Sequence, residues 1–163
     1  TQPAQPRGVK PSHPVSPTPP KVTPKPAPKP KPKPLPPAKS CIISAVGDDE
    51  YSGLAAPYVQ EILANRKFLV IDGPSVAESR LADVARNHIV LSAKSVGTRT
   101  LQFHGRSSEQ YTVRLTLKVV NPKTGAIVAG PTSKTVKYTS LNAEDNFREV
   151  VTSLMSRILP KLK

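Results

Sequence analysis

The residues best able to do chemistry are few and widely spaced in this sequence. The single cysteine, Cys41, begins an apolar run, and the three histidines are His13, His88 and His104. A thiolate nucleophile needs a cationic neighbour and a base, and a zinc site needs Cys or His ligands in close pairs. None of these four residues has a partner at such a spacing. We therefore predict a buried strand cysteine at Cys41, surface positions for His88 and His104, and no zinc site.

Carboxylates are clustered only in "DDE" at 48–50, directly after the apolar run. Clustered carboxylates suit Ca²⁺ or Mg²⁺, but three consecutive side chains point in different directions and no second cluster follows at loop spacing. Acids are favourable at a helix N-terminus, so we interpret this triplet as the start of a helix. The eight glycines form no phosphate-binding pattern. We predict no catalytic residue, no metal, no cofactor and no enzymatic activity.

Composition divides the chain into two parts. Residues 1–40 carry 15 of the 20 prolines and eight Lys or Arg, with no Asp or Glu. Residues 41–163 carry five prolines, 16 Lys or Arg and 11 Asp or Glu. The first part therefore supplies most of the net charge of +13. We predict a disordered, Pro/Lys-rich spacer over 1–40 and one domain over 41–163, which is long enough for a single core.

The composition of residues 1–40 indicates an extended spacer rather than a nucleic-acid-binding segment. Repeated X-Pro steps favour polyproline II geometry at about 3.1 Å per residue, so forty residues would span on the order of 100 Å. Sequence-independent nucleic-acid sites usually add arginines and aromatic stacking platforms. This stretch has one arginine, Arg7, and no aromatic residue. We therefore predict no specific nucleic-acid binding, although a basic nucleic-acid-binding protein stays a minor alternative.

Hydrophobic spacing predicts strands and helices in alternation over the first half of the domain. Short apolar runs predict strands at 41–46, 67–72, 88–96 and 98–103. A helix is expected from Ser52 onward, with Leu54, Tyr58 and Ile62 on one face and Leu63 as a further candidate for it. A second helix is expected over 75–88, with Val76, Leu81 and either Val84 or Ala85 at helical spacing.

The clearest pattern is the strict alternation that starts at Tyr111. Val113, Leu115, Leu117 and Val119 should face the core, whereas Thr112, Arg114, Thr116 and Lys118 should face the other way. A turn at 121–125 and a returning strand up to 139 complete a hairpin. A terminal amphipathic helix follows, with Asn142 as its cap and Phe147, Val151, Leu154 and Ile158 on one face. The fold class is α/β (α+β): a mostly antiparallel sheet packed against two or three helices.

Three stretches of the domain resemble bacterial envelope domains of the LpoB, CsgG and TolB N-terminal type. They are "VQEILANRKFLVIDGPSVAE" (59–78), "YTVRLTLKVVNPKTGAIVAG" (111–130) and "NFREVVTSLMSRILPKL" (146–162). In that family a helix runs into a strand of the form x-x-F-x-V-I-D. A long hairpin then carries D/N-x-x-T-G-x-I/V, and a terminal amphipathic helix packs on the sheet.

The resemblance implies a non-enzymatic module on the periplasmic side of a bacterial membrane, tethered by the spacer. Its partner would be another envelope protein or a periplasmic ligand. One role is the C-terminal sensory domain of a single-pass membrane receptor, such as a Ser/Thr kinase. Another is an LpoB-like lipoprotein that activates a peptidoglycan synthase. Because the chain begins with Thr1 inside spacer sequence, we expect a membrane anchor upstream of residue 1.

Two further expectations concern the spacer and the strand that begins at Tyr111. The Pro/Lys stretch also looks like the spacer of TonB, so a TonB-like energy-coupling protein is a minor alternative. For protein binding, the candidate residues are Arg114 and Lys118, because they lie on the polar side of that strand. The sequence leaves the oligomeric state open.

Overall fold

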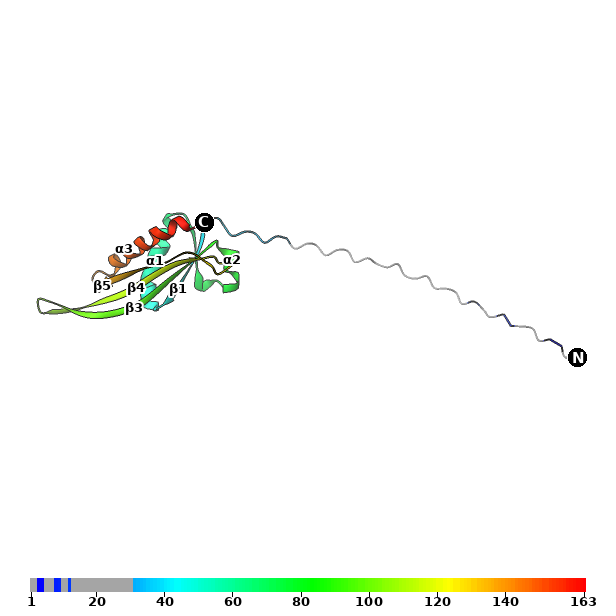
Figure 1. Ribbon diagram of the computed structural model, residues 1–163, viewed down its shortest axis with the longest axis horizontal. Helices are drawn as coiled ribbons and strands as arrows, with labels where there is room; N and C mark the ends of the chain where they lie inside the picture. Colours follow the sequence, from blue (N-terminus) through cyan, green and yellow to red (C-terminus); the bar gives the residue numbers. More distant parts are fainter. Residues whose placement is uncertain (1–2, 5–7, 10–11, 13–30) are drawn as a thin grey trace. The chain divides into compact units, whose positions relative to one another are not determined.

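The computed structural model describes residues 3–4, 8–9, 12 and 31–163 (Figure 1). The chain divides into two units, residues 1–32 and residues 33–163. Most of the predicted spacer lies outside the described residues. Within the second unit, the segment before the first strand is held by the fold: the Lys33 ammonium lies 3.2 Å from Asp83, and Arg86 Nε donates to the Pro36 carbonyl at 3.3 Å.

The second unit is built on one five-stranded sheet with the strand order β2-β1-β3-β4-β5. The strands are β1 (Ser40–Gly47), β2 (Leu69–Asp72), β3 (Asn87–Phe103), β4 (Arg106–Val120) and β5 (Ile127–Tyr138). Strand β1 runs parallel to β2 and β3, and the longer β3–β4 and β4–β5 ladders are antiparallel. The predicted α+β class, with a sheet packed against helices, is confirmed.

Two helices, α1 (Asp49–Asn65) and α3 (Ala143–Ile158), cover one face of this sheet. Figure 1 shows them side by side across the strands. The predicted alternation in β4 is confirmed, since Val113, Leu115, Leu117 and Val119 are fully buried against the helices. The predicted face of α3 is confirmed as well, because Phe147, Val151, Leu154 and Ile158 are all buried. Among the described residues, no helix combines the length and apolar composition needed to cross a membrane.

Helix α1 buries a face that differs from the predicted one except at Leu63. It begins at Asp49, so the acids at 49 and 50 lie in its first turn, as expected. Its buried side chains are Ser52, Ala55, Val59 and Leu63, whereas Leu54 is 38% exposed. Small residues face the sheet because they let the helix approach it closely, and the larger Tyr58 and Ile62 pack at the margin of the core.

The predicted helix over 75–88 is wrong. The segment forms two 3₁₀ turns (Gly73–Ser75 and Glu78–Arg80) and a single α-helical turn, α2 (Leu81–Val84). It packs on the face opposite α1 and α3, where Leu81 and Ala85 cover Ile42 of β1. Because this connection is so short, it covers only the β1–β2 end of that face.

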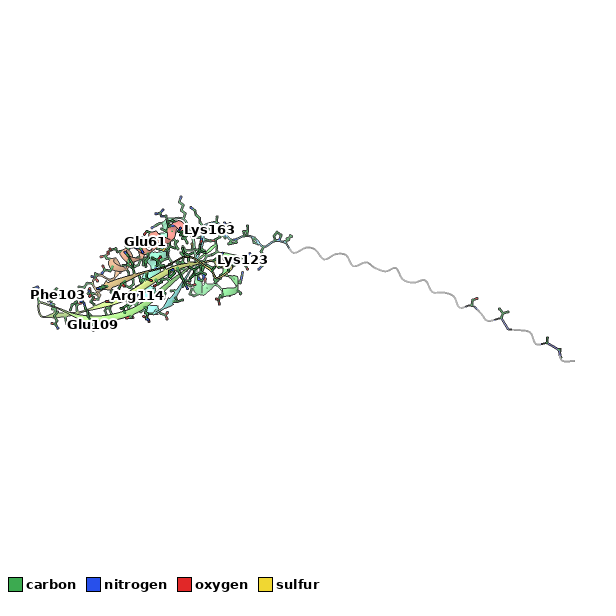
Figure 2. All side chains as sticks on the ribbon, viewed as in Figure 1. Glu61, Phe103, Glu109, Arg114, Lys123 and Lys163 are labelled. Carbon is green, nitrogen blue, oxygen red and sulfur yellow. The ribbon has the colours of Figure 1, made fainter. Side chains whose placement is uncertain are left out.

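Strand β3 is one continuous strand, although two strands were predicted at 88–96 and 98–103. A register shift between Ser95 and Gly97 marks a β-bulge where the two were expected to separate. Beyond it, residues 96–110 of β3 and β4 form a two-stranded hairpin, here called the arm. Its two-residue turn holds His104 at φ 47° and Gly105 at φ 77°. The arm extends past the helices, with Phe103 and Glu109 near its far end (Figures 1 and 2).

The second hairpin follows the prediction closely. In its turn the Asn121 carboxamide accepts from the Lys123 N–H at 2.8 Å, and Gly125 adopts φ 71°. The predicted cap of α3 differs in detail, because the Asn142 side chain makes no bond within the helix. Its Oδ1 instead accepts from the Thr139 N–H at 2.7 Å, which closes the connection from β5.

Candidate functional site

The side of β3, β4 and β5 that faces away from α1 and α3 is here called the open face. Helix α2 covers only the neighbouring β1–β2 end, so no described helix lies over it. The β-strand alternation and the pairing registers define its central residues: His88, Val90, Ser92, Lys94, Arg114, Thr116, Lys118, Ile127, Ser133 and Lys137. Both predicted binding residues, Arg114 and Lys118, belong to it.

Charge on these three strands is almost entirely of one sign. Glu109 is their only acid, and by alternation it points to the same side as Tyr111, away from the open face. The strands carry seven cationic residues: Lys94, Arg99, Arg106, Arg114, Lys118, Lys134 and Lys137. Lys134 lies opposite Leu115 and so belongs to the helix side of the sheet. The other six cations lie on the open face and the adjoining side of the arm.

The bulge at 95–97 determines which residues of the arm lie on the side of the open face. Before it, the even-numbered residues of β3 lie on the open face, as Lys94 opposite Arg114 does. After it, the odd-numbered residues take that side, so Arg99 lies opposite Gln110 and Phe103 opposite Arg106. Sequence reasoning missed this change, because a bulge reverses the alternation without altering residue type.

The open face is grooved where it meets α2. A depression of about 480 Å³ is lined by residues that include His88, Lys118 and Ile127. A second, of about 340 Å³, shares Val90, Lys118 and Ile127 with it and continues toward Thr116. The Thr116 hydroxyl is also hydrogen-bonded to the Ser133 hydroxyl on β5 at 2.7 Å. The groove thus combines hydroxyl groups, apolar side chains, the Lys118 ammonium and the Glu78 carboxylate, which is a composition suited to binding a polar surface.

His88 lines this groove and is half-buried, so it lies at the surface as predicted but is not freely exposed. Its Nε2 is 2.8 Å from the Ser44 hydroxyl on β1. Burial lowers the pKa of His88, and the neighbouring Lys118 ammonium lowers it further, whereas Glu78 acts in the opposite direction. His88 is therefore neutral at neutral pH and does not add to the positive charge of the open face.

The other candidate residues are not brought together. Cys41 is fully buried in the core, as predicted, and burial raises the pKa of its thiol to about 11. His104 lies at the tip of the arm. Asp48 has a structural role, since its carboxylate accepts from the Ser95 N–H at 2.8 Å where β1 ends. Among the described residues, no three His, Cys, Asp or Glu side chains are grouped so that they could hold a metal ion.

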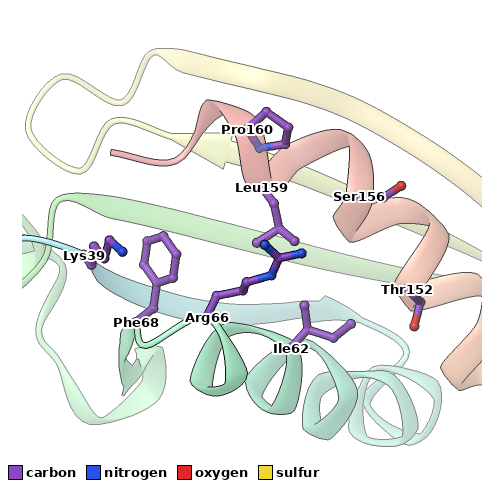
Figure 3. Close-up of a pocket in the computed structure, with 8 residues that line it drawn as sticks. All are labelled: Lys39, Ile62, Arg66, Phe68, Thr152, Ser156, Leu159 and Pro160. Carbon is purple, nitrogen blue, oxygen red and sulfur yellow. The ribbon is translucent and has the colours of Figure 1, made fainter.

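A further pocket of about 500 Å³ lies on the helix side of the domain (Figure 3). Its lining includes Ile62 of α1 and Arg66 just after it, together with Thr152 and Ser156 of α3 and Leu159 just after that helix. The pocket has a structural explanation. Its apolar residues belong to the margin of the core, and a cation at the end of α1 interacts favourably with the carbonyl end of that helix. We therefore place the candidate site on the open face.

Geometry and charge thus define a class of protein: an α+β domain with helices on one face of its sheet and a cationic, grooved open face. No protein-family model matches the sequence, and no curated protein matches it. The predicted membership in the LpoB, CsgG and TolB N-terminal group therefore stays a prediction.

Several solved structures of bacterial proteins are similar to the chain at low sequence identity. Lipoprotein GNA1162 from Neisseria meningitidis is 13% identical with a TM-score of 0.48, over 76% of this chain and 99% of that one. The PelC dodecamer from Paraburkholderia phytofirmans is 14% identical with a TM-score of 0.48, over 81% and 93%. A minor lipoprotein from Acinetobacter baumannii is 11% identical with a TM-score of 0.42, over 75% and 90%.

Proposed function

We propose that this chain is a non-enzymatic protein-binding domain of the bacterial envelope, carried on a Pro/Lys-rich spacer in the periplasm and binding an acidic partner protein through the open face. The observation that carries this proposal is the segregation of charge. Four cations, Lys94, Arg114, Lys118 and Lys137, share the open face, and the one acid of these strands points to the other side. Complementary charge of this kind steers association and selects partners.

The fold supports a binding role because the cations do not stabilise the domain itself. Lys94 lies directly opposite Arg114 in the β3–β4 ladder. Like charges at directly opposite positions are destabilising. Neither residue belongs to the ion pairs found among the described residues, which join Lys33 to Asp83 and Arg148 to Glu61. An anionic surface bound over both cations would remove this repulsion.

Two finer roles fit the proposal. One is the sensory domain of a single-pass membrane receptor such as a Ser/Thr kinase, and the other is an LpoB-like activator of a peptidoglycan synthase. Both need a tethered domain that binds by surface contact. An upstream transmembrane helix behind a kinase would favour the first role, and a lipoprotein signal would favour the second.

The test is site-specific photocrosslinking in cells, with a photoreactive residue in place of Thr116, which lies between Arg114 and Lys118. We expect one abundant crosslinked protein with an acidic contact surface, identified by mass spectrometry. The double substitution Arg114→Glu and Lys118→Glu should abolish the crosslink. Lys134→Glu, on the helix side of the sheet, is the matched control for a single charge reversal and is compared with Arg114→Glu alone, which should weaken the crosslink. Equal loss in both variants would contradict the proposal.

A second experiment separates protein binding from nucleic-acid binding. A fluorescent DNA duplex is titrated with the full chain and with a chain lacking residues 1–32. We expect weak, salt-sensitive binding that is lost with those residues and is unchanged by Arg114→Glu. Tight binding by the shortened chain that needs Arg114 would instead favour the nucleic-acid alternative.

A further inference from the structure

The arm exposes a strand edge of a kind that folded proteins usually protect. Strand β1 stops pairing with β3 at Ala93, and the Asp48 carboxylate caps the next free donor, the Ser95 N–H. From residue 97 to Phe103, no other described strand pairs with the outer side of β3. An isolated two-stranded hairpin is at best marginally stable in water. Its open edge is a template for another strand.

The other edges of the sheet carry protective devices that the arm lacks. Strand β2 is only four residues long. Strand β5 has two register shifts against β4, and Pro131 lies within it. Short strands, bulges and prolines are the features that block edge-to-edge pairing. In the arm the bulge lies at the base and leaves residues 97–103 in regular pairing with β4.

The only charged residue on this edge segment is turned away from the edge. Arg99 Nε donates to Gln110 Oε1 at 2.8 Å, across the hairpin on β4. The apolar side chain at the end of the segment is free, since Phe103 is 66% exposed. The segment "GTRTLQF" includes three residues of high β-propensity, Thr98, Thr100 and Phe103, and its one charged side chain is bonded across the hairpin rather than extended over the edge.

The two-residue turn determines which backbone groups are available. With positive φ at both His104 and Gly105, the flanking pair Phe103–Arg106 is the hydrogen-bonded pair that closes the hairpin. Hydrogen-bonded and non-hydrogen-bonded pairs alternate from there. The N–H and C=O groups of Thr98, Thr100 and Gln102 consequently point outward along the free edge.

We propose that this edge pairs with the same edge of a second copy of the chain, antiparallel and about a two-fold axis at Thr100. In this register Thr98 and Gln102 of one copy pair with Gln102 and Thr98 of the other, and the two Thr100 residues pair with each other. All three outward-pointing residues are then used, with about six hydrogen bonds. An axis at Leu101 would pair Thr98 with the turn residue His104, and an axis at Arg99 would pair Gln102 with the bulge. Either register would lose one pair of outward-pointing residues.

Side-chain chemistry favours the same register. Phe103 comes to lie opposite Gly97 of the second copy, an arrangement in which an aromatic ring covers a strand glycine. Arg99 lies opposite Leu101, so no two like charges are directly opposed, whereas an axis on Arg99 would oppose the two guanidinium groups. A two-fold axis perpendicular to the sheet also leaves both open faces on the same side of the dimer.

The test is sedimentation velocity of the full chain over a wide range of concentrations. We expect a monomer–dimer equilibrium that Thr100→Pro weakens by about tenfold or more, because proline removes the central donor. Ser107→Pro is the matched control: its N–H points outward on the β4 edge of the arm, and the dimer should persist. A wild-type chain that stays monomeric throughout, or equal weakening by both prolines, would overturn the proposal.

Charged substitutions at the axis test the register without proline. Thr100→Lys and Thr100→Glu should each weaken self-association, since identical charges meet at the axis. An equimolar mixture of the two variants should recover a dimer that contains one of each. Failure of the mixture to associate, while the wild type dimerises, would refute an axis at Thr100. The double variant Arg114→Glu and Lys118→Glu should dimerise normally, so this result and the binding of an acidic partner are separable.

Discussion

Lys94 of β3 lies directly opposite Arg114 of β4, and both side chains are on the open face of the sheet. The pair places two positive charges at adjacent positions in an antiparallel ladder, where like charges are destabilising. Residues retained at a cost to stability are commonly functional. The pair is therefore the most direct structural argument for a binding role.

Arg114→Glu should make the domain more stable while it weakens partner binding. The new carboxylate would face Lys94, so we expect the free energy of unfolding in urea to rise by about 0.2–1 kcal/mol. Arg114→Gln is the control that removes the repulsion without adding an attraction, and it should give a smaller rise. A loss of stability in the glutamate variant would show that Arg114 has a structural role.

Lys118→Gln should raise the pKa of His88. The Lys118 ammonium is one of the causes that lower this pKa, although burial of the imidazole is the larger one. The pKa should therefore move upward but stay below its ordinary value, as measured by NMR titration of the imidazole resonances. Lys134→Gln, on the helix side of the sheet, should leave the pKa unchanged. An unchanged pKa in the Lys118 variant would show that the Lys118 charge does not affect the ionisation of His88.

The domain should lose stability in alkali through two buried acidic groups. Burial raises the pKa of Cys41 from 9.0 to about 11 and that of Tyr138 from 10.0 to about 12. The unfolded chain therefore releases these protons at lower pH than the folded one. The contribution is fully present below pH 9 and is lost as pH rises toward 11 and 12.

By pH 11 the free energy of unfolding should fall by roughly 2 to 4 kcal/mol from these two groups. Urea unfolding at several pH values measures this fall, and Cys41→Ala should remove its first part. In the folded state at pH 8, Cys41 should also resist alkylation and react only after denaturation. Rapid alkylation of the native chain would contradict its burial.

Gly73→Ala should destabilise the domain far more than alanine does at another glycine. A Cβ at Gly73 would lie 2.5 Å from the Ile43 carbonyl oxygen and would also clash with the Ser44 hydroxyl. We expect a loss of about 1–3 kcal/mol, in the range of overpacked sites. Gly53→Ala is the control, because it has open space in α1 and should stabilise the helix by about 0.5–1 kcal/mol. Thermal unfolding compares the two.

Some of the fold could be predicted from residue pattern alone. The alternation from Val113 to Val119 and the helical spacing from Phe147 to Ile158 each identify a buried face, because burial of apolar side chains must follow the period of the backbone. The turn at Asn121 and Gly125 was equally predictable, since those residue types satisfy its geometry. The same alternation predicted that Arg114 and Lys118 lie on the side of β4 that faces away from the core.

Other features depend on neighbours that are distant in the sequence. Whether 75–88 forms a long helix or short turns depends on the distance it must cross from β2 to β3, and Ala55 rather than Leu54 is buried because α1 packs closely against the sheet. His88 is half-buried because Ser44 of β1 and the segment with Glu78 and Leu81 lie around it.

The charge of the strands and the buried face of β4 can thus be predicted from residue order, because the alternation of side chains along a strand is a local property. The uncovered face that the cations share, its extension along the arm by the bulge at 95–97, and the free edge over residues 97–103 cannot. They depend on which distant segments pack against the sheet or pair with its strands.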